Sequence, residues 1–345
     1  MAKKDGGTSQ GVQQLKNDLK AKHPARFYIL WGEEDYLCRH YLSQLRKQLL
    51  DELTEDFNFH PLNTETFSLQ AFSDALETLP MMAERSLIWL DEIDFFVQPE
   101  QEKLTELLSD LPEHCCLVCT YGEFKADKRK KKLWEAIEKH AVIAEFCYQS
   151  ESDLRAWIAR HFRAQGKEIS PELCNDLLSL CGLSMTRLHG EIGKICAYSG
   201  AQSIVRTDID AVVEPTLDAV VFQITDALGQ REYDRALERL HALLKMQTDP
   251  IPIVAAIGAQ MRRIYAAKVL QGEGRDAAEL AKLCGIAPYA AGKTMNQARR
   301  FSLRFCKNAV LLCGRTDYQM KSSYDAPERL AELLILQLAR EARDD

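Results

Sequence analysis

Short apolar segments that alternate with helical periodicity constrain the fold of this 345-residue chain more than any other feature. The predicted strands are the segments at 26–31, 57–63, 86–90, 115–120 and 141–147. Apolar residues between them recur at helical spacing, and these predicted helices are 36–53, 69–79, 99–111 and 128–139. Strands that alternate with helices predict a doubly wound parallel sheet.

The strand pattern ends near residue 148, and only helical patterns follow it. Three short helices are expected first, including an amphipathic helix at 151–164 and one at 188–198. Longer helices then continue to residue 345. The fold class is therefore α/β plus all-α, and the predicted parts are a flexible N-terminal extension (1–22), a parallel-sheet domain (23–148), a small helical lid domain (149–212) and a C-terminal helical domain (213–345).

Several classes of protein are disfavoured by composition. Every apolar run is far shorter than the roughly 20 residues that span a bilayer, and the polar N-terminus lacks the apolar core of a signal peptide. The 11 cysteines are an odd number, scattered through strand and helix patterns, which indicates reduced thiols. The group His114, Cys115, Cys116 and Cys119 has no second ligand pair, so no zinc site is predicted. We expect a cytoplasmic protein.

The turn after the first predicted strand is where a nucleotide-binding protein of this type would have its phosphate-binding loop. A phosphate-binding loop that starts at Gly32 would need Gly, Lys and Ser or Thr at positions 37–39, where this chain has Leu, Cys and Arg. The three residues after Gly32 are acidic. Carboxylates suit the N-terminus of a helix but repel a triphosphate. The loop therefore predicts no nucleotide binding.

The strand at 86–90 ends in Asp91-Glu92, the arrangement of a Walker B strand. In an active NTPase such an Asp holds magnesium, and the Glu orients water. Without a phosphate-binding loop, these carboxylates are interpreted as an acidic turn. The sequence also shows no Ser-His-Asp or Cys-His arrangement and no metal-ligand spacing among its eight His residues, so no catalytic residue, cofactor or metal is predicted.

At this point the sequence resembles the delta-subunit family of bacterial DNA polymerase III clamp loaders, from about residue 25 to 340. The resemblance rests on the order of several segments: FYILWGEEDYL at 27–37, TLPMMAERSLI at 78–88, DKRKK at 127–131, LHGEIGKI at 188–195 and QMRRI at 260–264, followed by Asp317 and Lys321. Each segment is weak evidence alone, and their shared order is specific.

The resemblance implies an AAA+-like module of two domains with a helical collar that assembles into a ring of five subunits. It implies a non-catalytic subunit that binds the beta sliding clamp and holds its ring open for loading onto primed DNA. The implied partners are the clamp, the tau/gamma and delta prime subunits, and primed DNA. ATP hydrolysis is expected of the neighbouring subunits, not of this chain.

The family's clamp contact is a helix end and turn that carries Leu-Phe. The corresponding residues here are Met81 and Met82, after Leu79 and Pro80. Pro80 stops the preceding helix, and adjacent exposed apolar side chains suit an apolar groove on a partner. Methionine is common at such surfaces, although this chain lacks the aromatic residue. The alternative is that both methionines pack into the core.

A basic block lies near the C-terminus. Residues 252–324 carry twelve Lys and Arg against four Asp and Glu, within a chain of net charge −7. Such a block favours a polyanion or an acidic partner. The candidate DNA-binding residues are Arg262, Arg263, Arg299, Arg300, Lys321 and Tyr324. The alternative is that Phe301 and Phe305 are core residues and that the charges are solvated or meet neighbouring subunits. The run Lys128–Lys132 is interpreted as a solvated helix start rather than a DNA contact.

Two other functions remain open from the sequence. The chain could be a divergent active AAA+ ATPase, against which residues 37–39 argue. It could instead be a helical scaffold with a degenerate AAA+ fold and no clamp or DNA role, against which the 79–82 segment and the basic block argue.

Overall fold

The computed structural model describes residues 10–286 and 288–345. By compactness, one unit contains the residues up to Ile158 together with Leu183–Gly190, and the other contains Ala159–Gly182 together with Glu191–Asp345. This division differs from boundaries at residues 148 and 212, which remain an interpretation of the sequence.

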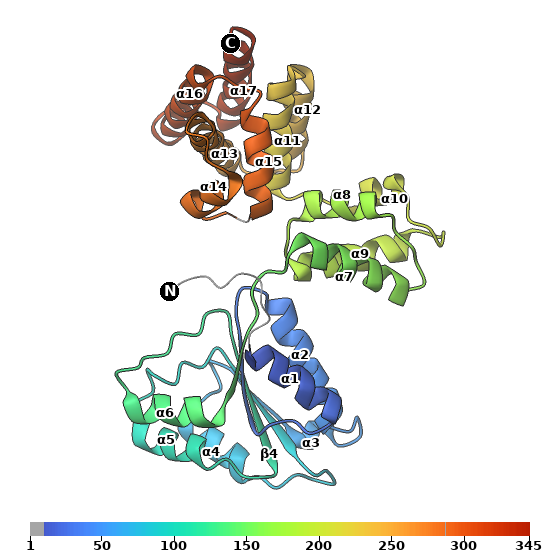
Figure 1. Ribbon diagram of the computed structural model, residues 1–345, viewed down its shortest axis with the longest axis vertical. Coiled ribbons are helices and arrows are strands. Elements are labelled where there is room, and N and C mark those ends of the chain that lie inside the picture. The colour runs from blue at the N-terminus through green and yellow to red at the C-terminus, as the bar shows by residue number, and fades with distance from the viewer. Residues whose placement is uncertain (1–9, 287) are drawn as a thin grey trace. The chain divides into compact units, whose positions relative to one another are not determined.

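The first unit is built on a five-stranded parallel sheet, as predicted (Figure 1). Its strands are β1 (Phe27–Trp31), β2 (Phe59–Leu62), β3 (Ser86–Asp91), β4 (Cys115–Tyr121) and β5 (Val142–Glu145). They lie in the order β2-β3-β4-β1-β5, and every pair is parallel. The amino ends of all strands therefore share one edge of the sheet, and the carboxyl ends share the other.

Helices cover both faces of this sheet (Figure 1). The helices of this unit's sheet region are α1 (Gln10–Ala21), α2 (Asp35–Leu49), α3 (Glu55–Asn58), α4 (Leu69–Glu77), α5 (Gln101–Ser109) and α6 (Lys131–His140). Phe27 and Ile29 of β1 pack with residues of α4, α5 and α6, whereas Tyr28 and Leu30 pack with residues of α1 and α2. The alternation follows from the period of two in a strand, and it makes β1 apolar throughout because both its faces are buried.

The prediction of a flexible extension over residues 1–22 is wrong for residues 10–21, which form α1. Leu15 is fully buried, and the Tyr28 hydroxyl donates to Asp18 Oδ2 at 2.7 Å. Gly11 permits the close packing, because a Cβ there would lie 1.8 Å from the Ile143 carbonyl oxygen in β5. The segment is polar overall and its helix has only a narrow apolar stripe, so the composition alone did not indicate a packed helix.

The helix predicted over 36–53 is also too long. It ends at Leu49, and the separate short helix α3 precedes β2. Leu50 is extended, and the Asp51 carboxylate accepts a hydrogen bond from the Leu53 amide at 3.1 Å. Aspartate side chains that bond nearby backbone in this way compete with helix formation.

The remainder of the described chain is helical apart from one isolated parallel bridge between Glu168 and Ser203. Its helices are α7 (Glu151–Ala164), α8 (Pro171–Cys181), α9 (Met185–Tyr198), α10 (Arg206–Val212), α11 (Leu217–Gln230), α12 (Tyr233–Lys245), α13 (Pro250–Gly272), α14 (Ala277–Cys284), α15 (Pro288–Ala298), α16 (Leu303–Ser322) and α17 (Pro327–Arg343). Side-chain caps explain several starts: the Ser170 and Ser302 hydroxyls accept from Leu173 and Phe305 amides.

Helix α13 lies at the centre of the C-terminal helices. Ile257, Met261 and Ile264 are fully buried in one core that includes residues of α11, α12, α16 and α17. The Phe301 and Phe305 rings stack within this core, with centroids 4.5 Å apart. These two rings are therefore core residues and are not available to stack on bases, which confirms that part of the alternative.

Eight of the eleven cysteines are buried and packed as small apolar residues, whereas Cys147 is exposed. Cys115, Cys116 and Cys119 are buried in β4, and burial raises the pKa of the Cys116 thiol to about 12. Within residues 10–286 and 288–345, no group of three or more His, Cys, Asp or Glu is placed to hold a metal ion. No helix among these residues has the length and apolar character needed to cross a membrane.

Candidate functional site

The 79–82 turn joins α4 to β3 at the edge of the sheet where the strands begin. Ser68 caps the start of α4 by accepting from the Ala71 amide at 3.0 Å, and Phe72 and Leu76 are buried against the sheet. At the other end the Thr78 hydroxyl donates to the Asp74 carbonyl at 2.7 Å. Helix α4 is thus fixed at both ends, and the chain leaves it immediately before the turn.

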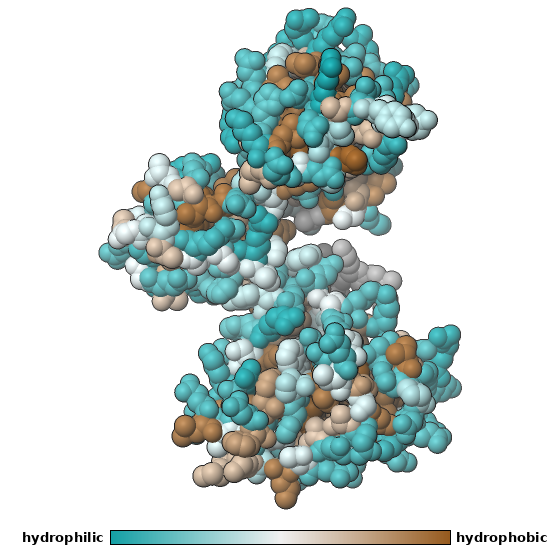
Figure 2. All heavy atoms as spheres, turned by 180° about the vertical axis from the view of Figure 1, so that it is seen from behind, coloured by the Kyte–Doolittle hydropathy of each residue, from teal (hydrophilic) through white to brown (hydrophobic). Residues whose placement is uncertain are grey.

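The apolar side chains of the 79–82 turn are exposed. Leu79 is 74%, Met81 is 51% and Met82 is 87% exposed. The alternative that both methionines pack into the core is therefore wrong. Figure 2 shows separate apolar side chains projecting along the lower margin of the sheet-containing unit, on a surface that is otherwise mostly hydrophilic.

The backbone of the turn, in contrast, is held by the buried Asn58 side chain and followed by the half-buried Arg85. The Asn58 side chain donates from Nδ2 to the Met81 carbonyl at 2.9 Å and accepts from the Met81 amide at 2.7 Å. Arg85 donates to the Pro24 carbonyl at 2.8 Å and to the Cys115 carbonyl at 2.9 Å. Met82 between them has a φ of 55°, in the left-handed region that non-glycine residues rarely occupy.

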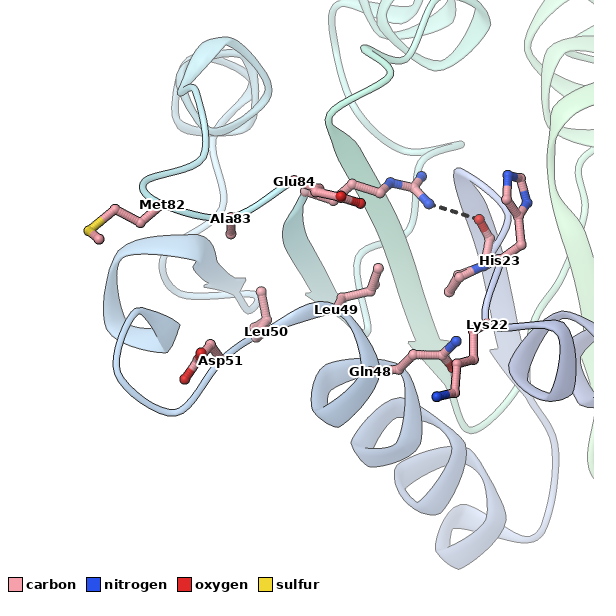
Figure 3. Close-up of a pocket in the computed structure, with 11 residues that line it drawn as sticks. Lys22, His23, Gln48, Leu49, Leu50, Asp51, Met82, Ala83 and Glu84 are labelled. Atoms are coloured by element: carbon pink, nitrogen blue, oxygen red, sulfur yellow. Dashed lines mark hydrogen bonds between the residues drawn. The ribbon is translucent and has the colours of Figure 1, made fainter.

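A groove of about 640 Å³ separates this turn from the end of α2 (Figure 3). Leu49 and Leu50 line one side, and Ala83 and Glu84 line the other. The Met82 side chain points outward, away from the other residues drawn (Figure 3). The turn therefore presents apolar side chains to solvent from a fixed main chain, which is the arrangement of a preorganised contact.

At the opposite edge of the sheet, where the strands end, lies the place that a phosphate-binding loop would occupy. Gly32 follows β1 with a φ of 135°, and a Cβ there would lie 2.3 Å from the Phe146 carbonyl oxygen. This glycine is needed for close backbone packing, not for room around a phosphate. The acidic residues predicted to repel phosphates follow it directly.

The carboxylate of Glu34 lies at this edge of the sheet. Its side chain is buried, and its Oε2 accepts from the Met185 amide at the start of α9 at 3.3 Å. Burial raises the pKa of the Glu34 carboxyl above its ordinary value, while hydrogen bonds from the Met185 and Tyr36 amides oppose that rise. A negative charge at a helix N-terminus is stabilised by the helix dipole, so this protein carboxylate fills the type of position that binds anions elsewhere.

The Walker B-like carboxylates are also engaged by the protein. Asp91 Oδ1 accepts from the Thr120 hydroxyl at 2.6 Å, and that hydroxyl accepts from Trp89 Nε1 at 2.8 Å. Glu92 Oε1 accepts from the Gly122 amide at 2.6 Å. These bonds join the ends of β3 and β4, so the pair has a structural role, consistent with its interpretation as an acidic turn.

The structure does not bring the candidate DNA-binding residues into one cluster. Arg299 and Arg300 precede α16, whereas Lys321 lies in its last turn. A helix rises 1.5 Å per residue, so these two groups are roughly 30 Å apart along the axis. Tyr324 is fully exposed just after the helix.

Part of the basic block is paired internally. Arg300 forms a salt bridge with Asp226 at 2.6 Å, and Lys321 forms one with Asp317 at 2.8 Å. Arg263 is half-buried. Arg262 and Arg299 are exposed, and neither takes part in a salt bridge with another residue that the structure describes.

Comparisons with known proteins identify the family. The family model "DNA polymerase III, delta subunit" matches residues 28–147, and that of the "DNA polymerase III delta subunit, C-terminal domain" matches residues 218–338. The chain is 29% identical over 328 residues to DNA polymerase III subunit delta of Bacillus subtilis (strain 168), covering 92% of this chain and 93% of the relative. The chain belongs to the DNA polymerase III delta-subunit family.

Further relatives agree with this membership over nearly the whole chain. The probable DNA polymerase III subunit delta of Aquifex aeolicus (strain VF5) is 22% identical over 343 residues, with 96% of both chains covered. The solved structure of the Bacillus subtilis DNA clamp loader delta protein is similar with a TM-score of 0.65 and 26% identity, covering 95% of this chain and 99% of that chain. This delta-family chain therefore resembles the solved clamp loader delta protein in fold over most of its described length.

Sequence reasoning missed three residues that precede β2 in this delta-family chain, of which Asn58 bonds to Met81 in the 79–82 turn. Leu53 is 88% and Phe57 is 57% exposed, and both belong to the segment that leads into β2. Asn58 was assigned only to a strand. The one available signal was an Asn among apolar residues, and an Asn predicted to be buried needs partners that only the fold can supply.

Proposed function

We propose that this chain is a clamp-loader delta subunit that binds the beta sliding clamp through Leu79, Pro80, Met81 and Met82 and holds the ring open for loading onto primed DNA. The observation that carries the proposal is the exposure of Leu79 and Met82 on a main chain fixed by Asn58 and Arg85. Exposed adjacent apolar residues on an ordered turn fit an apolar groove on a partner.

We propose further that the chain does not hydrolyse ATP. Glu34 lies buried where a phosphate-binding loop would meet its ligand, and Asp91 and Glu92 are bonded to Thr120 and Gly122. The partners proposed are the clamp, the tau/gamma and delta prime subunits in a five-subunit ring, and primed DNA. An active ATPase would need free carboxylates at the ends of these strands for magnesium.

The decisive experiment measures binding of the purified chain to the sliding clamp from the same organism by surface plasmon resonance without nucleotide. We expect tight binding, and we expect Met81→Ala combined with Met82→Ala to weaken it at least 100-fold. Two apolar anchors each lose roughly 1.5–3 kcal/mol of burial, which corresponds to that factor. The unfolding transition should be unchanged, because both side chains are exposed in the free chain.

Val97→Ala is the matched control for this pair. Val97 is 71% exposed in the same unit, but it follows β3 at the other edge of the sheet. We expect its clamp affinity to equal that of the unmodified chain. Unchanged affinity in the Met81/Met82 double variant would overturn the proposed contact.

We infer that Arg262 and Arg299, which are exposed and form no salt bridge among the described residues, are the cations most available to DNA among the six candidate residues. Primed DNA bound to the assembled loader should dissociate more readily as salt rises, with a slope that each lost phosphate contact reduces by about 0.9. Replacing both by Ala should therefore flatten the salt dependence, with Lys139→Ala, an exposed residue outside the basic block, as the control. A slope that is the same in the double variant would remove these two residues from the DNA contact.

A further inference from the structure

The Asn58 side chain is the one buried polar group that bonds the main chain of the 79–82 turn directly, among the residues that the structure describes. It is fully buried, and its amide nitrogen and oxygen both bond to Met81, at 2.9 and 2.7 Å. A carboxamide that donates and accepts at once reproduces the pairing of a neighbouring β-strand. Asn58 therefore holds the main chain of Met81 at one fixed distance from the start of β2.

Two features show that this turn needs such a restraint. Met82 has a φ of 55°, which a residue with a long side chain adopts only when its surroundings impose it. Its side chain is 87% exposed, so packing against the protein cannot impose it. The restraint must therefore act through the main chain, and the hydrogen bonds nearest to Met82 are those between Asn58 and Met81.

Arg85 supplies the second anchor, three residues beyond Met82. Its bonds to the Pro24 and Cys115 carbonyls fix the chain where it enters β3. Arg85 alone would leave Pro80–Glu84 free to rearrange between the end of α4 and this anchor. Asn58 divides that span, so the left-handed conformation falls on the residue immediately after the bonded one.

We propose that Asn58 is the positioning residue of the clamp contact: its carboxamide fixes Met81 and thereby holds the Met82 side chain in the outward conformation that docks. This inference rests on the function proposed above. A ligand that binds only one conformation of a flexible segment has its apparent affinity reduced by the fraction of the chain in that conformation. Loss of the Asn58 bonds lowers that fraction without removing any atom that touches the clamp.

The test compares Asn58→Ala, Asn58→Asp and the control Asn63→Ala in the full chain by surface plasmon resonance with the sliding clamp. Asn58→Asp keeps the size and one acceptor but loses the donor and sets a carboxylate against the Met81 carbonyl. Asn63 caps a separate exposed turn through the Thr66 amide at 3.0 Å. We expect about tenfold weaker binding for both Asn58 variants, faster amide hydrogen exchange at Met81, and unchanged affinity for Asn63→Ala.

A combination of variants separates positioning from general destabilisation. In a background that carries both Met81→Ala and Met82→Ala, which itself weakens binding, Asn58→Ala should cost little more, because the two side chains that it positions are gone. A purely structural role would instead lower affinity equally in both backgrounds, and that result would overturn the inference. If Asn58→Ala does not fold, Asn58→Asp supports the same comparison.

The two levels of the proposal fail in different ways. Full affinity of the Met81→Ala/Met82→Ala double variant would overturn the proposed clamp contact and, with it, this inference. Weak binding of that double variant together with full affinity of folded Asn58→Ala and Asn58→Asp would overturn only the role of Asn58.

Discussion

The two edges of the parallel sheet differ in their surface side chains: one carries carboxylates that are hydrogen-bonded within the protein, and the other carries apolar side chains that are exposed to solvent. At the edge where strands end, the residues that resemble an NTPase site are bonded to the protein itself: Glu34 to α9, Asp91 to Thr120 and Glu92 to Gly122. At the edge where strands begin, Leu79 and Met82 are largely exposed to solvent. At the first edge these carboxylates are satisfied by hydrogen bonds within the protein, whereas the second edge exposes apolar surface that only another molecule could bury.

This difference separates the stability of the chain from its binding. Substitutions at the closed edge should change the free energy of unfolding and leave clamp affinity intact. Substitutions at the 79–82 turn should do the reverse, as proposed above.

The largest effect is expected for Gly32→Ala. Its Cβ would lie 2.3 Å from the Phe146 carbonyl oxygen, and φ at this position is 135°. We expect the free energy of unfolding to fall by at least about 3 kcal/mol in urea denaturation. The control is Gly122→Ala, whose Cβ would meet nothing nearer than Glu92 Oε1 at 3.6 Å. Equal stability of the two variants would show that this edge is not tightly closed.

A smaller loss is expected for Thr120→Val. The change leaves Trp89 Nε1 without its acceptor and Asp91 without its donor while preserving the shape of the side chain. An unsatisfied buried polar group costs about 1–3 kcal/mol, so we expect a loss of 1–2 kcal/mol in the same assay. Thr120→Ser keeps the hydroxyl and should recover part of it. Stability that is unaffected by Val, or a gain of magnesium-ATP binding, would contradict a structural role for the Asp91–Thr120 bond.

The smallest effect, and the one with the opposite sign, is expected for Glu34→Gln. The pKa of Glu34 is raised by burial, so the ionised carboxylate costs stability above the folded pKa, and that cost disappears as pH falls toward the unfolded value near 4.5. Glutamine keeps an acceptor for the Met185 amide without a buried charge.

We therefore expect Glu34→Gln to be more stable than the unmodified chain at pH 7.5, by under about 1 kcal/mol. The difference should shrink as the pH is lowered toward 5, as followed by thermal unfolding at several pH values. A variant that is less stable at pH 7.5, or a difference independent of pH, would show that the hydrogen bonds and the helix dipole outweigh the cost of burying this carboxylate.

Most of the sheet was predictable from the sequence because buried parallel strands are nearly continuous apolar runs. β1, β3 and β4 follow this pattern, and their predicted and observed bounds differ by at most one residue. The absence of a phosphate-binding loop was equally readable, since it depends on residue types at fixed spacing. The helix at residues 10–21 was not predictable in this way, because the roles of Gly11 and of its two buried apolar residues become apparent only when the helix packs on the sheet beside β5.

The candidate turn divides in the same manner. The sequence by itself determined that a helix ends before Pro80 and that two methionines follow this proline, since both statements concern neighbours along the chain, although the helix ends at Glu77 rather than at the predicted residue 79. Only the tertiary structure decided that those methionines face solvent and that Asn58, 23 residues earlier, bonds to Met81. The physical reason is that side-chain exposure and buried hydrogen bonds depend on which distant segments pack together, and local residue preferences do not specify those contacts.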